Sequence, residues 1–396
     1  MLWRKGPHEV RADRRAIPGG DRETRVISSA VFAIIRCSKD PVMHRLTPLC
    51  CSALLLVAAT VPANGQASDT LAALLARNQY DLAVDGRQFL LKEMSKASFV
   101  LVGGLHGDNE TQALLQMAMA GLADGPTLII TEMSPWAANR LFATAPDDAG
   151  VRLRGADIED AQLPLLIREL AAAKLENRTV QEMAALVENG YRRSLARDLL
   201  NLARQVSDVR GGSPGGVPLV TLLIRTLEVE TDRSSPETAG LPASLRRERV
   251  MKDFFLTHYR EAAAAGGKPK VAAVFGRNHL HRGIDRRGVS TLGNFIAELA
   301  VAEGAGSFNV ALFAAGGTIA LGGTREIDER KDDPAFGFLA SAARQSATVF
   351  DMAPLREGLR NIPAAERTLA QSSLLYWADS YDAVICYRQV TPLGGR

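Results

Sequence analysis

The stretch that decides the fold is FVLVGGLHGDNE, residues 99–110. It begins with a continuous apolar run, 99–103, which is typical of a strand covered on both faces, as in a parallel sheet. A glycine-rich turn follows, and the amphipathic segment 110–122 after it predicts a helix. A strand, a turn and a helix in this order indicate a βαβ unit.

Similar apolar runs occur along the rest of the chain. Two of them, 127–131 (TLIIT) and 271–275 (VAAVF), also end beside polar or glycine-rich turns. The other strand candidates are 309–313, 383–387 and 347–350. A helix is expected from Pro135 to Leu141 with Ser134 as its N-cap, because proline is tolerated in the first turn. The sequence therefore predicts an α/β fold with a mostly parallel central sheet flanked by helices.

Residues 158–265 contain no convincing strand and predict a large helical insertion. Its helices are expected over 161–173, 180–206, 217–228 and 245–265. A glycine-rich linker at 210–216 and a polar loop at 232–242 interrupt the helical pattern. We expect the insertion to form a cap over the carboxyl-terminal ends of the strands.

The N-terminal part of the chain predicts export. Residues 43–67 have a short basic start, an apolar core and small residues at Gly65 and Ala67, as a secretory signal peptide does. The core is short for a membrane span, which needs about 20 residues, although an uncleaved anchor is the alternative. Residues 1–42 are interpreted as a start-site artefact or a disordered leader. The mature protein is then 68–396, one domain, periplasmic or secreted.

Charge and cysteine content limit the possible partners. The leader holds 10 of the 47 Lys and Arg residues and 5 of the 44 Asp and Glu residues, so 37 basic and 39 acidic residues remain, a net charge of about −2. No basic face with interleaved aromatic residues is seen, which argues against nucleic-acid binding. Only Cys386 remains after cleavage, so an internal disulfide is excluded and a buried thiol is expected. The expected partner is a small-molecule substrate. Contact with a membrane is expected only through the signal segment before its cleavage. No pattern indicates an oligomeric state.

Polar side chains follow three of the predicted strands. His106 follows the first strand, Glu132 the second, and His279 and His281 the third. In parallel α/β sheets ligands bind at the carboxyl ends of strands, so these residues are expected to converge on one site. Taken singly, each has a structural interpretation: a helix cap for His106, a partner of a helix dipole for Glu132, and surface positions for the later histidines.

Several well-known motifs are absent from the sequence. There is no G-x-S-x-G elbow, no H-E-x-x-H pair, no Walker A loop and no G-x-G-x-x-G fingerprint. A serine hydrolase and a nucleotide-dependent enzyme are therefore disfavoured.

Three blocks of the chain resemble the erythromycin-esterase-like family, which belongs to a superfamily with the ChaN-like haem-binding proteins and the Tiki-type, TraB-like metalloproteases. The blocks are 100–110 (VLVGGLHGDNE), 128–135 (LIITEMSP) and 270–283 (KVAAVFGRNHLHRG). They match, in order, a strand ending in G-E-x-H-G or G-E-x-x-H, a strand ending in Glu, and a late strand ending near a second His. The segment 249–259 (RVMKDFFLTHY) is similar to the helix before the late block, and the resemblance spans about 95–315 and a strand near 381–391.

The resemblance implies hydrolysis of an ester or lactone by a histidine-activated water. His106 would be the general base, Glu132 would orient its imidazole and favour the charged form, and His279 would be a proton donor or second base. Arg277 or Arg282 would stabilise the developing oxyanion. One position departs from the family pattern: Gly104 stands where the family has its first Glu, so the role of that Glu would fall to Glu110, or the chemistry would be changed or lost.

Two other classes of function remain open, whereas the esterase-like interpretation needs no cofactor. In a metallohydrolase, His106, Glu132, His279 and His281 would bind Zn or Mn, because His-x-His spacing puts both imidazoles on one side of an extended strand. In a haem- or small-ligand-binding protein, His258 or Tyr259 would be the axial ligand.

Overall fold

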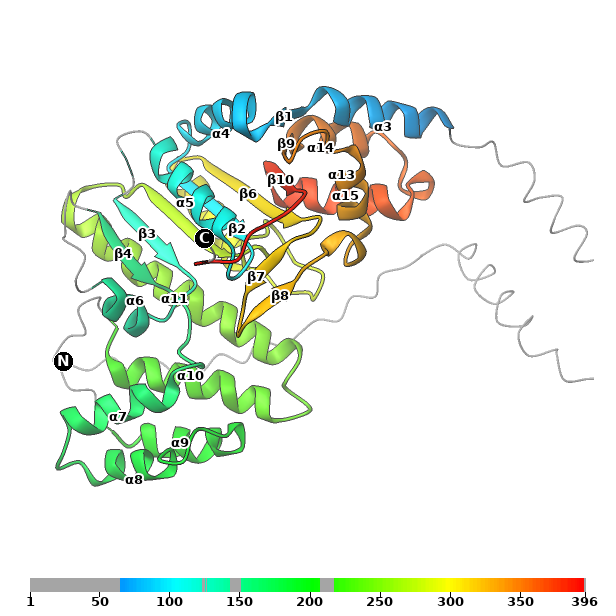
Figure 1. The fold of residues 1–396 in the computed structure, drawn as a ribbon. Helices are drawn as coiled ribbons and strands as arrows, with labels where there is room; N and C mark the ends of the chain where they lie inside the picture. The colour runs from blue at the N-terminus through cyan, green and yellow to red at the C-terminus, as the bar shows by residue number, and fades with distance from the viewer. Residues whose placement is uncertain (1–64, 123–124, 126, 143–150, 207–216, 395–396) are drawn as a thin grey trace, which may run out of the picture. The chain divides into compact units, whose positions relative to one another are not determined.

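The apolar runs assemble into one eight-stranded sheet with the order β1-β9-β10-β6-β2-β5-β3-β4 (Figure 1). The computed structural model describes residues 65–122, 125, 127–142, 151–206 and 217–394. The strands are β1 Gln79–Asp81, β2 Phe99–Gly104, β3 Leu128–Thr131, β4 Arg152–Gly155, β5 Val271–Gly276, β6 Ser307–Ala314, β9 Ala347–Asp351 and β10 Ala383–Tyr387. Neighbours from β10 to β4 pair in parallel, whereas β9 pairs antiparallel with both β10 and β1. The predicted α/β class and mostly parallel sheet are confirmed.

Helices cover both faces of this sheet. The helices outside the segment between β4 and β5 are α3 Gly65–Arg77, α4 Arg87–Met94, α5 Asn109–Gly121, α6 Pro135–Phe142, α12 Leu292–Ala302, α13 Pro334–Ala342, α14 Met352–Arg360 and α15 Leu369–Ser380. Alternate residues of β2 enter two different cores: Val100 packs with α4 and α5, and Leu101 belongs to the larger core with α11 to α15. Both faces of the strand are buried, which explains its unbroken apolar sequence. The predicted N-cap of α6 is also present, since Ser134 Oγ accepts from the amide of Ala137 at 3.0 Å.

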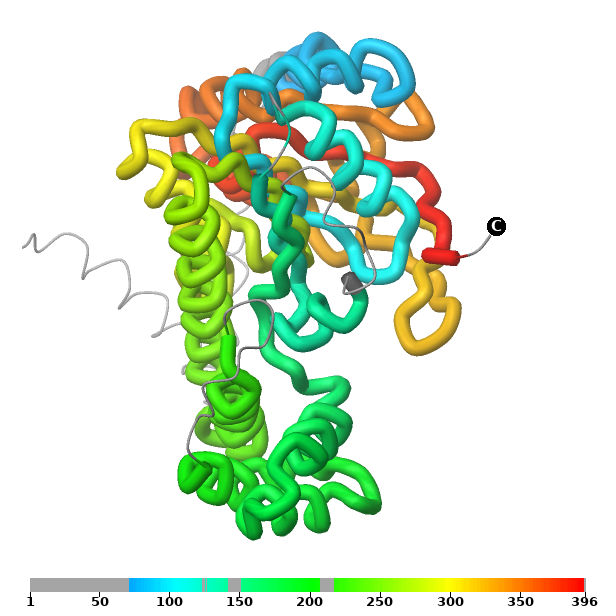
Figure 2. The backbone as a smooth tube through the Cα atoms, turned by 90° about the vertical axis from the view of Figure 1, so that its left-hand side faces the viewer, coloured from blue at the N-terminus to red at the C-terminus, as the bar shows by residue number. Residues whose placement is uncertain are grey.

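The described residues between β4 and β5 are mostly helical. It contains α7 Leu163–Ala173, α8 Arg178–Leu186, α9 Ala196–Ala203, α10 Leu219–Ser234 and α11 Leu241–Gly266. The helix expected over 180–206 is two helices, because the chain turns at Gly190, where φ is +99°, and again in the 3-10 turn Arg193–Leu195. Figure 2 shows α7 to α10 gathered at one end, with the long helix α11 running from them to the sheet.

The strands that sequence patterns missed lie at the edges of sheets. β1 and β4 are the outermost strands of the main sheet, and β7 Thr318–Ala320 pairs with β8 Thr324–Glu326 in a separate hairpin. These strands are three or four residues long and mostly half-buried or exposed, so they lack a continuous apolar run.

The predicted leader and most of the signal segment, residues 1–64, lie outside the described residues. Residues 65–67, at the predicted cleavage site, form the start of α3. Within the described ranges, no helix combines the length and the apolar composition that crossing a membrane would require. Cys386 is a free, buried thiol in β10, and burial raises its pKa to about 12, as expected of a core residue.

Candidate functional site

Three neighbouring strands bring the predicted site residues together. β2, β5 and β3 are adjacent and parallel, so their carboxyl ends lie at one edge of the sheet. Glu132 follows β3 directly, and its carboxylate lies between two imidazoles. Its Oε2 is 3.7 Å from Nε2 of His106, and its Oε1 is 3.5 Å from Nε2 of His279. The structure thus places two imidazoles beside one carboxylate.

The carboxylate of Glu132 is fixed by two further donors. The amide of Gly276 donates to Oε2 at 2.5 Å, and Nη2 of Arg247 donates to Oε1 at 2.9 Å. A side chain at position 276 would displace the imidazole of His106, because a Cβ there would lie 2.9 Å from Nε2 of His106 and 3.2 Å from Oε2 of Glu132. Glycine at the end of β5 therefore allows the imidazole and the carboxylate to meet.

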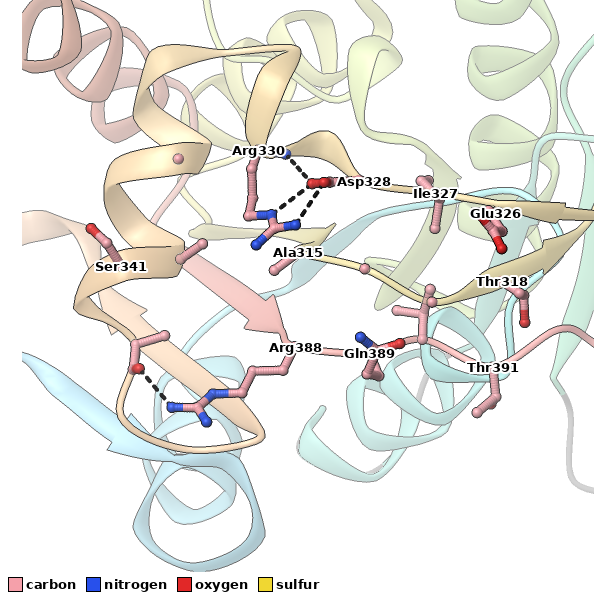
Figure 3. Close-up of a pocket in the computed structure, with 16 residues that line it drawn as sticks. Ala315, Thr318, Glu326, Ile327, Asp328, Arg330, Ser341, Arg388, Gln389 and Thr391 are labelled. Atoms are coloured by element: carbon pink, nitrogen blue, oxygen red, sulfur yellow. Dashed lines mark hydrogen bonds and ion pairs between the residues drawn. The ribbon is translucent and has the colours of Figure 1, made fainter.

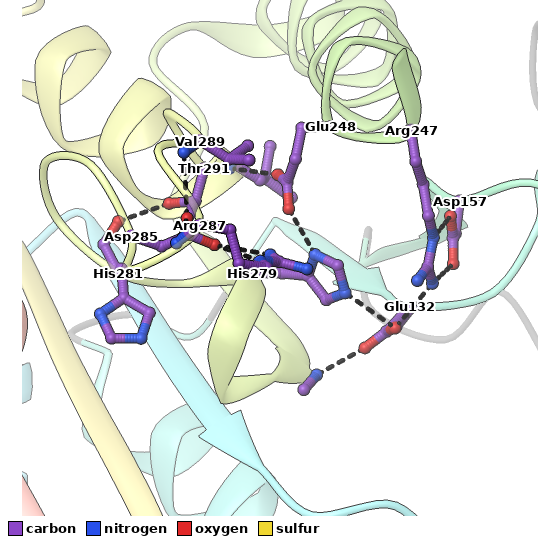
Figure 4. A network of polar contacts seen from close by, with 12 residues as sticks. Glu132, Asp157, Arg247, Glu248, His279, His281, Asp285, Arg287, Val289 and Thr291 are labelled. Carbon is purple, nitrogen blue, oxygen red and sulfur yellow. Dashed lines mark hydrogen bonds and ion pairs between the residues drawn. The ribbon is translucent and has the colours of Figure 1, made fainter. Parts of the chain in front are cut away.

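His279 is held from its other side by a buried acid. Its Nδ1 lies 2.5 Å from Oε1 of Glu248, a residue of α11 that is 2% exposed (Figure 4). Burial lowers the pKa of His279, but the hydrogen bond to Glu248 and the negative charge of Glu132 outweigh this effect, so the pKa is raised. The environment of His279 therefore favours the imidazolium form.

His106 occupies a different environment from its neighbours. Its side chain is 55% exposed, whereas those of Glu132 and His279 are each 11% exposed. The turn that carries His106 is held by the carbonyl of Gly107, which accepts from the amides of Ala320 at 2.8 Å and of Leu393 at 2.9 Å. The site thus has one solvent-facing imidazole and one enclosed imidazole, with a carboxylate between them.

Three residues of this network were not found from the sequence: Asp157, Arg247 and Glu248. Nε of Arg247 donates to Asp157 Oδ1 at 3.0 Å, and Asp157 follows β4, the strand that the patterns missed. Glu248 carried a signal, because it falls on the buried stripe of α11 that includes Met251 and Phe255. A charged residue in such a stripe indicates a buried polar partner.

The structure places Glu110 and Arg277 away from this carboxylate. Glu110 accepts from the amide and the hydroxyl of Thr391, at 3.0 and 2.8 Å, and so ties the start of α5 to the C-terminal segment. Arg277 pairs with buried Glu329 and lies 5.0 Å over the ring of Phe336. Its guanidinium therefore contacts buried residues and not Glu132.

Arg282 lies at the opposite end of the strands from the predicted site. Its Nη1 is 2.6 Å from Asp382, and its Nη2 is 3.2 Å from the side chain of Asn309 and from the carbonyl of Ser307. Ser307 and Asn309 belong to the first residues of β6, whereas His106 and Glu132 follow the last residues of their strands. The predicted contact of Arg282 with an oxyanion at the carboxyl ends of the strands is not supported by this geometry.

His281 does not join His279, contrary to the His-x-His prediction. The chain from Arg277 to His279 forms a 3-10 turn, not an extended strand, so the two imidazoles diverge (Figure 4). His281 is 1% exposed, and its ring lies 4.9 Å from Trp377 and 5.0 Å from Tyr376. Over the described part of the chain, no group of three or more His, Cys, Asp or Glu residues is arranged to hold a metal ion.

The burial of His281 leads to a prediction about acid stability. Burial lowers its pKa to about 4, below the value of about 6.5 expected in an unfolded chain. Between these values the unfolded chain binds the additional proton, so stability falls as the pH falls from about 6.5 to about 4. His281→Phe removes the group that binds this proton. The decrease in the free energy of unfolding between about pH 6.5 and about pH 4 is therefore expected to be smaller in the variant by about 3 kcal/mol. Urea unfolding at a series of pH values measures this; parallel curves for both proteins would contradict it.

The two residues considered as haem ligands are in the core. His258 is 1% exposed, and its Nε2 lies 3.1 Å from the carbonyl of Gly155 in β4. Tyr259 is 5% exposed and stacks on Phe99 with 5.7 Å between ring centroids. Both side chains join α11 to the sheet, which is the ordinary role of a buried helix face.

The space beside Gly104 is already filled. A Cβ at this position would collide with the side chain of Thr111 in α5. The hydroxyl of Thr111 accepts from the amide of Leu105 at 3.0 Å and donates to Asp108 at 2.9 Å. Thr111 and Asp108 therefore form a buried network beside the position where the resemblance leads one to expect a glutamate.

A cavity of about 990 Å³ lies beyond the carboxyl ends of β6 and β10 (Figure 3). Its lining includes Thr318, Arg330, Arg388 and Thr391, but not the two histidines of the site or Glu132. The Arg330 guanidinium is paired with Asp328 at 2.7 Å. The cavity is therefore separate from the carboxylate and the two imidazoles at the ends of β2, β5 and β3.

Comparisons with known proteins show similarity at the level of the fold. No family model matches the chain, and no curated protein matches its sequence. A crystal structure of a Bacillus cereus protein is 12% identical with a TM-score of 0.51, and covers 82% of this chain and 98% of its own. The two chains therefore share a fold.

Two further solved structures each have a TM-score of 0.49. One is a histidine-to-asparagine variant of the erythromycin esterase EreC in its open conformation, 15% identical and covering 81% of this chain and 97% of its own. The other is a succinoglycan biosynthesis protein, 12% identical and covering 82% and 97%.

Proposed function

We propose that this protein is a hydrolase that cleaves an ester or lactone of a small molecule with a histidine-activated water. The observation that carries the proposal is the carboxylate of Glu132 lying between the imidazoles of His106 and His279 at 3.7 and 3.5 Å. One imidazole is exposed and the other has a raised pKa. Two like groups in unlike environments are suited to opposite proton-transfer roles.

The exposed imidazole is the proposed base. Nε2 of His106 faces Glu132, so Nδ1 is the atom that removes a proton from water as the water oxygen bonds to the substrate carbonyl carbon. The negative charge of Glu132 stabilises the imidazolium that forms. The buried imidazole is the proposed acid. Nδ1 of His279 is bound to Glu248, whereas Nε2 lies 3.5 Å from Glu132, farther than an ordinary hydrogen bond. As the bond between carbon and the leaving oxygen breaks, Nε2 gives its proton to that oxygen.

The helices between β4 and β5 are proposed to cap this site and to select the substrate. Support comes from α11, which supplies both Arg247 and Glu248 to the residues at the strand ends. We further propose that the reaction takes place outside the cytoplasm, on the strength of the signal-like segment 43–67.

The test compares two glutamates that differ in position. Glu132→Gln keeps the shape of the side chain but removes the charge between the imidazoles, and is expected to lower kcat/KM for the best substrate of an ester and lactone panel by about 10²-fold. Glu110→Gln, at the carboxylate bound to Thr391, is expected to leave kcat/KM unchanged. Equal rates for the two variants, or no hydrolysis of any panel member by the wild type, would refute the proposal.

A further inference from the structure

We propose that Glu248, a residue of the helical segment between β4 and β5, is the positioning residue that fixes the ring orientation and the tautomer of His279. The two residues are 31 positions apart in sequence, and Glu248 lies on α11 whereas His279 ends the turn after β5. Their contact, Nδ1 to Oε1 at 2.5 Å, is buried on both sides. The kinetic part of this inference rests on the proposed hydrolysis, but the structural part does not.

Glu248 accepts two hydrogen bonds, one on each oxygen of its carboxylate. Oε1 accepts from Nδ1 of His279, and Oε2 accepts from the amide of Leu292 at 2.8 Å. Leu292 is the first residue of α12, where a backbone amide has no partner within its own helix. Because Glu248 is 2% exposed, water does not replace either bond.

The bond to Glu248 determines which ring nitrogen of His279 carries a proton. With Nδ1 donating to Glu248, Nδ1 carries a proton in every state of the ring, and Nε2 is the atom that faces Glu132 at 3.5 Å. The other charged group nearby, Arg247, is held by Glu132 and Asp157. A ring rotated by half a turn would lose the bond to Glu248, so the orientation is set by one buried acceptor.

Glu248→Gln is the variant that separates positioning from packing. Leu292 and His279 approach different oxygens of the carboxylate, and a glutamine keeps only one of those oxygens, so one of the two loses its acceptor. If the oxygen stays with Leu292, the amide NH₂ faces Nδ1, and the proton of His279 must move to Nε2. We therefore expect the ¹⁵N spectrum of histidine-labelled protein to show that Nδ1 of His279 is protonated in the wild type and unprotonated in the variant. The resonance is assigned by its loss in His279→Gln.

The kinetic readout is a separate arm of the same experiment. Loss of an orienting partner is expected to lower kcat about 10²-fold with little change in KM, because the substrate still binds but the proton donor is misaligned. Glu248→Asp restores the charge and is expected to recover part of kcat. The matched control is Asp253→Asn, which removes an exposed carboxylate from the same helix and should change neither the ¹⁵N pattern nor kcat.

The outcomes distinguish the two proposals. An unchanged ¹⁵N pattern of His279 in Glu248→Gln overturns the positioning role, whether or not the protein hydrolyses esters. A changed pattern with no hydrolysis by the wild type supports the positioning role and rejects the proposed function. If Glu248→Gln does not fold, the Glu248→Asp protein decides: full kcat and an unchanged pattern would overturn the inference, because a shortened side chain cannot hold both donors at their present distances.

Discussion

His106→Ala is expected to lower kcat/KM for ester or lactone hydrolysis by about 10²–10⁴-fold, the usual contribution of a positioned general base. The same change is expected to alter the free energy of unfolding by less than about 0.5 kcal/mol, because exposed side chains contribute little to packing. The side chain of His106 is 55% exposed, and its nearest charged partner, Glu132, lies at 3.7 Å. Initial rates and urea unfolding of the same preparations measure the two quantities.

Chemical rescue provides the control for this variant. The space that an exposed imidazole leaves is open to solvent, so added imidazole should restore part of the rate of His106→Ala. Imidazole should not restore the rate of Glu132→Gln, in which the ring of His106 is still present. An alanine variant that keeps the wild-type rate would show that His106 is not the base.

Gly104→Glu, which introduces the acid that the G-E-x-H motif carries at this position, is expected to lower the free energy of unfolding by about 3 kcal/mol. Gly104 is buried, and a Cβ there collides with Thr111, so the larger side chain must displace the Thr111–Asp108 network and place a carboxylate without room for water. Burial already raises the pKa of Asp108, so a second acid beside it is unfavourable. Urea unfolding measures the loss.

Two comparisons test this explanation. Gly266→Glu adds the same side chain at an exposed position with nothing within 4 Å, and should cost little. In a Thr111→Gly background the cost of Gly104→Glu should be smaller by more than about 1 kcal/mol, because the colliding atoms are gone. A cost for Gly104→Glu no greater than that for Gly266→Glu would contradict the collision.

The features predicted correctly from the sequence are those set by residues close together in the chain. Buried parallel strands are apolar on both faces, so continuous apolar runs in the sequence indicate β2, β5 and β3. Ligands bind at the carboxyl ends of such strands, and this rule predicts that His106, Glu132 and His279 lie together. These predictions depend only on local composition and on the parallel order of the strands.

The parts that sequence patterns missed depend on side chains from distant segments. Arg247 and Glu248 reach the site from α11, 115 and 31 positions from the partners they bind. The direction of His281 depends on a 3-10 turn that spacing does not indicate. The resemblance implies an oxyanion role for Arg277 or Arg282, but each guanidinium is paired with a carboxylate distant in the sequence, Glu329 or Asp382.

The two amides that converge on the carbonyl of Gly107 have a consequence for biosynthesis. Ala320 and Leu393 are made more than two hundred residues after His106, so the histidine turn leaves the ribosome long before its two anchors exist. Closing such a distant contact is slow compared with forming the neighbouring helix α5. The turn that carries the solvent-facing imidazole therefore reaches its final position only after residue 393 has been made and has left the ribosome.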